Sequence, residues 1–281
     1  MNEINKKPTV TIGIPAYNEE ANIGHLLKDI LEQKREGFVL EKIIVASDGS
    51  TDSTVLISEE NKNLPMQIFD NKERKGVAVR MNQIIGKCFS DVLIILNADI
   101  LIPDQKFISR IIQPIAEKKA DLVSCKVEAL ESRSFFGRVL KANFDFKEIF
   151  FGEYHQGKNI FTCHGVARAF SKNFYSHFRF TESVGEDAYS YLYCLWQGFS
   201  YVYVSDTSVL IKLSENFADH KKQSLRFSDS KSLFHGKFGE NFIQKQYRLP
   251  IGLLFKKLPG YFFKNPVLAG VFLLQNCYLK F

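Results

Sequence analysis

Acidic and polar side chains directly follow three apolar runs of the chain, where they could bind a nucleotide and a cation. In chain order the residues at these positions, which include the apolar Pro15 and Ala98, are Pro15, Tyr17 and Glu19, then Asp48, and then Asn97, Ala98 and Asp99. The Asp48 carboxylate can accept a hydrogen bond from the N–H of a base, and the Tyr17 ring offers a face for stacking. Asp99 suits a hard divalent cation that bridges a diphosphate, with Asn97 as a neutral oxygen ligand. These residue types predict a binding rim for a nucleotide diphosphate.

A basic segment between the second and third of these groups supplies positive charge for phosphate oxygens. It contains Lys75 and Arg80, and Gly76 lets a ligand approach the backbone closely. Neither GxGxxG nor GxxxxGKS/T, the usual glycine-rich phosphate motifs, occurs in the sequence. Taken singly, the rim residues are also explained by a turn, a packed ring, a helix cap or solvated charges. Their shared position after successive strands favours the functional interpretation.

Four apolar runs with strand character alternate with three helical patterns in the first hundred residues. The predicted strands span residues 10–14, 42–46, 66–69 and 92–96, and the predicted helices span 23–31, 51–61 and 77–88. Thr51 or Asp52 is the expected cap of the second helix. Strands separated by helices favour an α/β fold with a parallel sheet covered on both faces. Ligands bind beyond the carboxyl ends of the strands in such sheets.

The composition is that of an ordinary globular protein and excludes several other classes. The 281 residues carry 37 Lys+Arg and 31 Asp+Glu, a formal net charge of +6, and no nucleic-acid partner is expected. Five cysteines without CxxC spacing favour a reducing compartment over a disulfide or zinc framework. The N-terminus lacks the apolar core of a secretory signal. No apolar stretch reaches the ~18 residues of a membrane span.

Six short motifs resemble those of family 2 glycosyltransferases, in the same order along the chain. They are PAYNEE (15–20), SDGSTDST (47–54), KGVAVRMN (75–82), LNADI (96–100), GEDAYSYL (185–192) and QSLRF (223–227). The first two are specific as a pair, and the resemblance covers residues 8–230. It implies the GT-A fold, in which a Rossmann-like, mostly parallel central sheet is flanked by helices. It also implies inverting transfer of a sugar from a nucleotide-diphosphate donor.

The resemblance implies roles for individual residues on the donor side. Tyr17, Glu19 and Asp48 would surround the base and ribose. Asp99 would be the metal-binding acid of the family's DxD signature and would hold Mn²⁺ or Mg²⁺. Asn97 stands at the first position of that signature, which removes one negative charge from the expected cation site. The full expected donor-binding set is Pro15, Tyr17, Glu19, Asp48, Lys75, Arg80, Asn97, Ala98, Asp99, Gln223 and Arg226.

On the acceptor side the resemblance implies a catalytic acid pair and a nearby histidine. Asp187 would be the general base that takes the proton of the acceptor hydroxyl, and Glu186 would orient Asp187 or the acceptor. Residues 188–196 look helical, so acids at that helix start would also be favoured by its dipole. His164 and Gly165 match a stretch near the family's acceptor site, with a structural histidine as the alternative.

Phenylalanine is concentrated in the second half of the chain. Residues 130–156 show a helical pattern that fits either an amphipathic helix at lipid or over the acceptor channel, or a helix packed on the core. After residue 248 the chain consists of short apolar pieces that prolines divide and lysines flank. This pattern suits an interfacial anchor, and a dimer contact or a strap across the core are the alternatives. The expected domains are 1–235 (8–125 nucleotide-binding, 126–235 acceptor) and an amphipathic tail, 236–281, joined by a loop at 234–239.

The favoured hypothesis is a glycosyltransferase at the cytoplasmic face of a membrane, acting on an acceptor hydroxyl. The sequence leaves open whether the acceptor is a lipid-linked saccharide and whether the chain forms a homodimer. A non-catalytic nucleotide-sugar-binding protein of the same fold is one alternative. The catalytic fragment of a membrane polysaccharide synthase is another.

Overall fold

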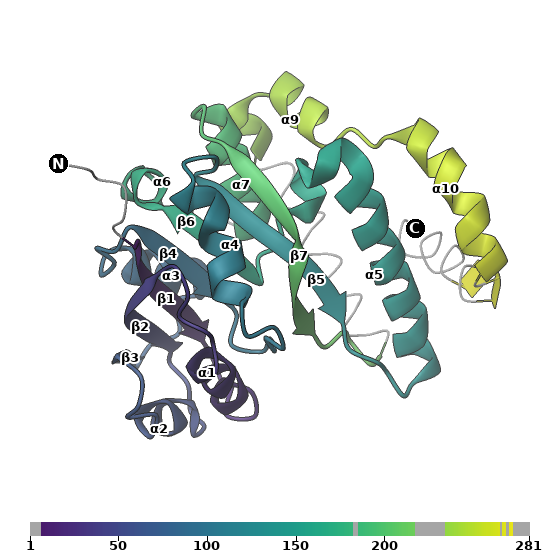
Figure 1. Ribbon diagram of the computed structural model, residues 1–281. Helices are drawn as coiled ribbons and strands as arrows, with labels where there is room; N and C mark the ends of the chain where they lie inside the picture. The colour runs from purple at the N-terminus through teal and green to yellow at the C-terminus, as the bar shows by residue number, and fades with distance from the viewer. Residues whose placement is uncertain (1–6, 182–184, 217–233, 265, 268–269, 272–281) are drawn as a thin grey trace.

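The computed structural model describes residues 7–181, 185–216, 234–264, 266–267 and 270–271, and Figure 1 shows their arrangement. A seven-stranded sheet runs through the molecule in the order β3-β2-β1-β4-β6-β5-β7. The strands are β1 (Thr9–Ala16), β2 (Val39–Asp48), β3 (Met66–Asn71), β4 (Val92–Leu96), β5 (Leu122–Ala129), β6 (Ala167–Ser171) and β7 (Tyr201–Ile211).

β6 is antiparallel to both of its neighbours, and every other neighbouring pair is parallel. The carboxyl ends of the other six strands therefore meet at one edge of the sheet, and β6 begins at that same edge. The expected mostly parallel α/β architecture is confirmed. The reversed strand brings a segment from the second half of the chain to the edge where the predicted donor residues lie.

Helices cover both faces of the sheet, as continuously apolar parallel strands require. They are α1 (Ile23–Leu31), α2 (Thr54–Glu59), α3 (Val77–Ile85), α4 (Phe107–Ala116), α5 (Phe135–Glu153), α6 (Lys172–His177), α7 (Glu186–Trp196), α9 (Glu240–Gln246) and α10 (Ile251–Lys264). Two short 3₁₀ turns, Tyr154–Gly157 and Ile160–Thr162, follow α5. One buried apolar cluster packs α1 and α4 on the sheet, and a second packs α3, α6 and α7 on it.

The four predicted strands and three predicted helices of the first hundred residues are all present, and β4 begins and ends at the predicted residues. The predicted cap of α2 is wrong. Its N-cap is Ser53, whose side chain makes no capping hydrogen bond. Asp52 instead accepts hydrogen bonds from the backbone N–H groups of Thr54 (3.0 Å) and Glu20 (3.0 Å). Asp52 therefore ties the start of α2 to the segment after β1.

The loop predicted at residues 234–239 is also wrong, because residues 234–238 are helical. Phe234 and Phe238 are both 2% exposed and belong to the second apolar cluster. The Phe238 ring lies 5.8 Å from that of Tyr189 and 5.9 Å from that of Trp196, both on α7. Burial of these two rings outweighs the turn tendency of the neighbouring glycines, so this segment continues the core.

The prolines after residue 248 do not divide the described tail into separate pieces. Pro259 lies within α10, and Pro250 immediately precedes the helix, where its missing N–H has no intrahelical partner to lose. Over the described residues, no helix combines the length and apolarity needed to cross a membrane. Cys88, Cys125, Cys163 and Cys194 are free and buried.

Candidate active site

A cavity of about 370 Å³ opens at the carboxyl ends of β1, β2 and β4. It is lined by Pro15, Ala16, Tyr17, Glu19, Asp48, Arg74, Gly76, Val77, Arg80, Asn97, Ala98 and Asp99. All seven residues that the sequence places directly after apolar runs are in this lining. The topology brings them together because three parallel strands end side by side.

Asp48 holds the loop that forms one wall of the cavity. Its carboxylate accepts hydrogen bonds from the N–H of Lys75 (2.8 Å), the N–H of Gly76 (2.8 Å) and Nε of Arg80 (2.7 Å). Burial works against ionisation of Asp48, but these hydrogen bonds and the charge of Arg80 hold the pKa of its carboxyl below the ordinary value. The Arg80 guanidinium, expected at phosphate, is thus engaged by Asp48. The Lys75 ammonium pairs with Glu73 at 3.1 Å and lies outside the cavity lining.

Tyr17 presents its ring to the cavity beside a cation that the sequence did not single out. The guanidinium carbon of Arg74 lies 3.8 Å from the centre of the Tyr17 ring, a close cation–π contact. Arg74 is thus a cation in the cavity lining next to the position expected for a base.

Two carboxylates, Glu19 and Asp99, give the cavity an excess of negative charge at one end. Burial raises the pKa of Glu19, and the charge of Asp99 adds to this increase. Within the described part of the chain, no three His, Cys, Asp or Glu side chains group as a metal site. Mg²⁺ is commonly held by one or two carboxylates together with substrate phosphates. Asp99 and Glu19, with the Asn97 amide, fit a cation that shares its ligands with a diphosphate.

The reversed strand β6 joins this cavity to the second half of the chain. Leu96 at the end of β4 pairs with Ala167 at the start of β6, and the Asn97 N–H donates to the Val166 carbonyl at 2.9 Å. Asn97 of the cavity lining is therefore next to the segment that contains Gly165.

The predicted acid pair lies against this segment. Glu186 and Asp187 begin α7 after Gly185, whose φ of 91° is in the left-handed region that favours glycine. A Cβ atom on Gly165 would lie 3.3 Å from Oε1 of Glu186 and 3.4 Å from Cβ of Asp187. Burial and the charge of Asp187 raise the pKa of Glu186, and the charge of Arg168 opposes this. Glu186 therefore holds a proton more readily than an ordinary glutamate does.

Arg168, the second residue of β6, is a fully buried cation next to the start of α7. One guanidinium nitrogen, Nη1, donates to the Glu186 carbonyl (3.0 Å) and to Oγ of Ser190 (2.8 Å). Its Nε has no hydrogen-bond partner among the described residues. A buried charge is costly unless it is compensated. The guanidinium is hydrogen-bonded to the start of α7 and its charge acts on Glu186, which indicates that it fixes this end of the helix and offsets its acidic charge.

His164, which is partly buried, and Glu148, which is buried, form a second pair on the other side of Gly165. Glu148, on α5, hydrogen-bonds Nε2 of His164 with one oxygen and accepts from the Val127 N–H (3.2 Å) with the other. Burial opposes protonation of His164, but the hydrogen bond and charge of Glu148, together with the charge of Asp187, raise its pKa. We call His164, Glu148, Arg168, Glu186 and Asp187 the acid–base cluster.

The structure brings together most of the residues expected to act, in two adjoining groups. The cavity contains the expected donor residues except Lys75, Gln223 and Arg226, and the last two lie outside the described residues. The acid–base cluster contains His164, Glu186 and Asp187, with Gly165 packed between them. Sequence reasoning missed Arg74, Glu148 and Arg168. An arginine inside an apolar strand pattern is the one signal that could have indicated Arg168.

Comparison with known proteins gives a family match and partial relatives. The model described as Glycosyl transferase family 2 matches residues 11–178. A poly-beta-1,6-N-acetyl-D-glucosamine synthase from Staphylococcus aureus (strain COL) is 31% identical over 108 residues, which cover 35% of this chain and 26% of that protein. The chain thus corresponds to about a quarter of the length of that relative.

Two solved structures share the fold at low sequence identity. A mannosyltransferase from Pyrobaculum calidifontis, in complex with GDP-Man and Mn²⁺, matches 98% of this chain and 85% of its own with a TM-score of 0.67 and 16% identity. Glucosyl-3-phosphoglycerate synthase from Mycobacterium tuberculosis, in complex with Mn²⁺, UDP and glucosyl-3-phosphoglycerate, matches 83% of this chain and 80% of its own, with a TM-score of 0.59 and 16% identity. The expected GT-A fold is confirmed by this likeness.

Proposed function

This chain belongs to glycosyl transferase family 2, and on that premise we propose that it is an inverting transferase that moves a sugar from a nucleotide-diphosphate donor to an acceptor hydroxyl. The observation that carries the proposal is the connection between the cavity lining and the acid–base cluster. The Glu186–Asp187 pair packs on Gly165, and neighbouring Val166 is hydrogen-bonded to Asn97 of the cavity lining. A donor in the cavity would then have a carboxylate base close to its reacting end.

The donor would lie along the cavity with its base at Tyr17 and its diphosphate towards Asp99. Arg74 would supply positive charge to the diphosphate in place of Lys75, since it lines the cavity and Lys75 does not. GDP-Man and UDP in the two solved structures described above support a nucleotide donor of this class.

A divalent cation would complete the donor site. Mn²⁺ in both of those structures supports this part of the proposal, and Asp99, Glu19 and Asn97 are the residues that would hold it here. When bound, it would neutralise negative charge that grows on the leaving diphosphate. Asn97 contributes no charge, so the carboxylates of Asp99 and Glu19 would balance the charge of the cation.

The transfer step assigns separate roles to the acid pair. The acceptor O–H gives its proton to the Asp187 carboxylate while its oxygen bonds to the anomeric carbon. The bond from that carbon to the diphosphate oxygen breaks on the opposite face, and the configuration inverts. Glu186 holds a proton more readily than an ordinary glutamate, which makes it the weaker candidate for the base and favours Asp187 in that role.

The acceptor would enter from the side of His164 and α5. We propose a lipid-linked saccharide as acceptor and polysaccharide or glycolipid synthesis as the pathway, supported by the similarity to the S. aureus synthase named above. Four free, buried cysteines favour a reducing compartment, so we place the reaction at the cytoplasmic face of a membrane.

The first experiment is a thermal-shift screen of nucleoside diphosphates and nucleotide sugars with and without Mn²⁺. A ligand of the native state raises the midpoint according to its concentration relative to its Kd, so the true donor class should stand out in the presence of the cation. No stabilisation by any nucleotide would contradict the donor proposal. Stabilisation that is unchanged by EDTA would contradict the cation proposal.

The second experiment compares two matched variants in release of the nucleoside diphosphate from the identified donor. Asp187→Asn should lose roughly 10²- to 10⁴-fold in turnover while nucleotide binding stays within about twofold. Asp206→Asn, which alters an exposed acid outside both groups, should behave as wild type. Turnover of Asp187→Asn within a few-fold of wild type would reject Asp187 as the base.

A further inference from the structure

α10 presents an apolar face that packs on no other described part of the chain. Ile251, Phe255 and Phe263 are 60%, 72% and 89% exposed. At 3.6 residues per turn these three positions lie within about 120° of the helix circumference, and Lys256 and Lys257 lie outside that arc. Along this face a hollow of about 460 Å³ is lined only by apolar side chains, those of Phe255, Leu258, Pro259, Phe263 and Pro266.

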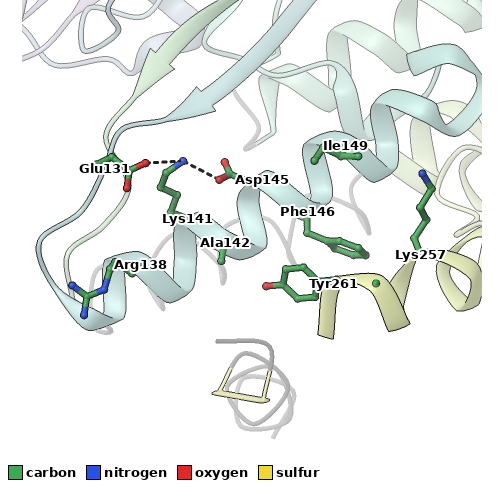
Figure 2. A pocket seen from close by; sticks show the side chains of 10 residues that line it. Glu131, Arg138, Lys141, Ala142, Asp145, Phe146, Ile149, Lys257 and Tyr261 are labelled. Carbon is green, nitrogen blue, oxygen red and sulfur yellow. Dashed lines mark hydrogen bonds and ion pairs between the residues drawn. The ribbon is translucent and has the colours of Figure 1, made fainter. Parts of the chain in front are cut away.

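The opposite side of α10 is attached to α5, as Figure 2 shows. The Tyr261 ring lies 4.6 Å from that of Phe146, and its hydroxyl donates to Oδ1 of Asn143 at 3.1 Å. Lys257 forms an ion pair with Glu153 at 2.6 Å. These contacts hold one side of α10 against α5, so the apolar face on its other side points away from the core.

The tail sequence that carries this face has basic residues and no acids, and Glu153 of α5 pairs with Lys257 on the opposite side of the helix. Residues 241–281 contain six basic residues, Lys245, Arg248, Lys256, Lys257, Lys264 and Lys280, and no Asp or Glu. A helix with an apolar face, cations beside it and no acids matches helices that lie in the interface of anionic bilayers. A second copy packed face to face would oppose like charges across its two-fold axis.

We propose that α10 docks this protein on an anionic lipid bilayer, with Phe255 and Phe263 among the acyl chains and Lys256 at the headgroups. Binding of this surface to lipid is physically independent of the transfer reaction. The benefit of lipid docking for the reaction rests on the proposed function, because α5 contacts α10 on one side and carries Glu148 of the acid–base cluster on the other. A bilayer bound at α10 would hold a lipid-linked acceptor on the side where the acceptor enters.

The test is sedimentation of the full chain with vesicles of phosphatidylcholine alone or mixed with phosphatidylglycerol. Wild type should bind the mixed vesicles and bind the neutral vesicles at least about tenfold more weakly. Phe255→Ser and Phe263→Ser should each weaken binding about tenfold, and Lys256→Gln about fivefold. Phe89→Ser is the matched control, because Phe89 is 71% exposed and lies in the loop before β4, and it should bind as wild type does.

Four results would overturn the proposal. The first is that Phe255→Ser and Phe263→Ser bind vesicles as well as wild type does, and the second is that Phe89→Ser loses as much binding as they do. The third is that wild type binds both vesicle types equally. The fourth is that light scattering shows a wild-type dimer that Phe255→Ser dissociates. The last would assign the face to a second copy. Retained thermal stabilisation by the nucleotide in these variants shows that they are folded and separates loss of lipid binding from failure of the proposed function.

Discussion

Replacing Asp48 with alanine removes one carboxylate from three donors at once. Lys75 N–H, Gly76 N–H and Arg80 Nε all lie within 2.8 Å of its oxygens. The side chains of Arg80 and Asp48 are only 6% and 7% exposed. The variant therefore leaves a buried guanidinium without its partner and frees the loop that carries Arg74 and Gly76. We expect the protein to lose stability even when no nucleotide is present.

The structure sets the size of this loss. Removal of one partner of a buried ion pair typically costs about 3–5 kcal/mol. At roughly 2–4 °C per kcal/mol for a chain of this size, the Tm should fall by about 10 °C near neutral pH. Because the folded-state pKa of Asp48 is depressed, its contribution is present above the ordinary aspartate pKa of about 4 and is lost as the pH falls through the folded-state value. The difference from wild type should therefore shrink in acid.

Thermal unfolding of four variants measures the effect. Asp48→Ala and Arg80→Met should each be strongly destabilised, and the double variant should lose less than the sum of the two because it leaves no unpaired charge. Asp70→Ala is the control, since Asp70 forms an exposed pair with Lys72, and such pairs contribute about 0–1 kcal/mol.

One outcome would refute this reasoning. If Asp48→Ala keeps its Tm within about 2 °C of wild type and loses only nucleotide affinity, Asp48 acts through direct contact with the base, and the hydrogen bonds to the loop contribute little. Additive losses in the double variant would likewise show that the buried pair is not coupled.

Three further predictions concern the acid–base cluster and the cation. Arg168→Met should lower kcat at least about tenfold with little change in the donor KM, because the N-terminal part of α7 loses two hydrogen bonds and a compensating charge. Arg168→Lys should recover part of the loss, and an unchanged kcat in steady-state assays would contradict the role. Glu148 raises the pKa of His164. The stability that the Glu148–His164 pair gives is therefore complete below about pH 6.5 and is lost as the pH rises through the raised pKa. The Tm of Glu148→Gln should differ most from that of wild type at low pH, and a Tm difference independent of pH would argue against this coupling. Asn97→Asp adds a carboxylate and should tighten Mn²⁺ binding about tenfold by calorimetry with nucleoside diphosphate present; an unchanged affinity would place the cation elsewhere.

Much of the fold could be predicted because local patterns and burial agree in the first hundred residues. The run from Val92 to Leu96 is fully buried in the centre of the sheet, so its continuous apolar pattern matched its environment. The helical turn at 234–238 was missed because glycines at 236 and 239 suggested a loop. Phe234 and Phe238 are spaced four apart, on one helical face, and their contact with α7 decides the structure.

The candidate site was predictable where its residues follow strands, and not where they act through partners distant in the chain. Tyr17, Asp48 and Asp99 meet because of the sheet topology alone. Glu148 and His164 meet through the packing of α5 beside β5, which no sequence spacing encodes. Arg74 sits one residue before the predicted Lys75, and the direction of each side chain out of the loop decides which one enters the cavity.

The stacked pair of Arg74 and Tyr17 gives the cavity an internal competitor. A guanidinium is planar and covers part of an aromatic face much as a base would, and here it lies 3.8 Å above the ring centre. A nucleobase that stacks on this face must displace the arginine. The affinity of the nucleotide is then set by the difference between the base–Tyr17 and the Arg74–Tyr17 stacking interactions. A sugar diphosphate without a base would avoid that exchange, while a full nucleotide would release Arg74 towards its own phosphates. Stacking of a base on the Tyr17 ring and positive charge at the diphosphate are thereby coupled through the Arg74 side chain.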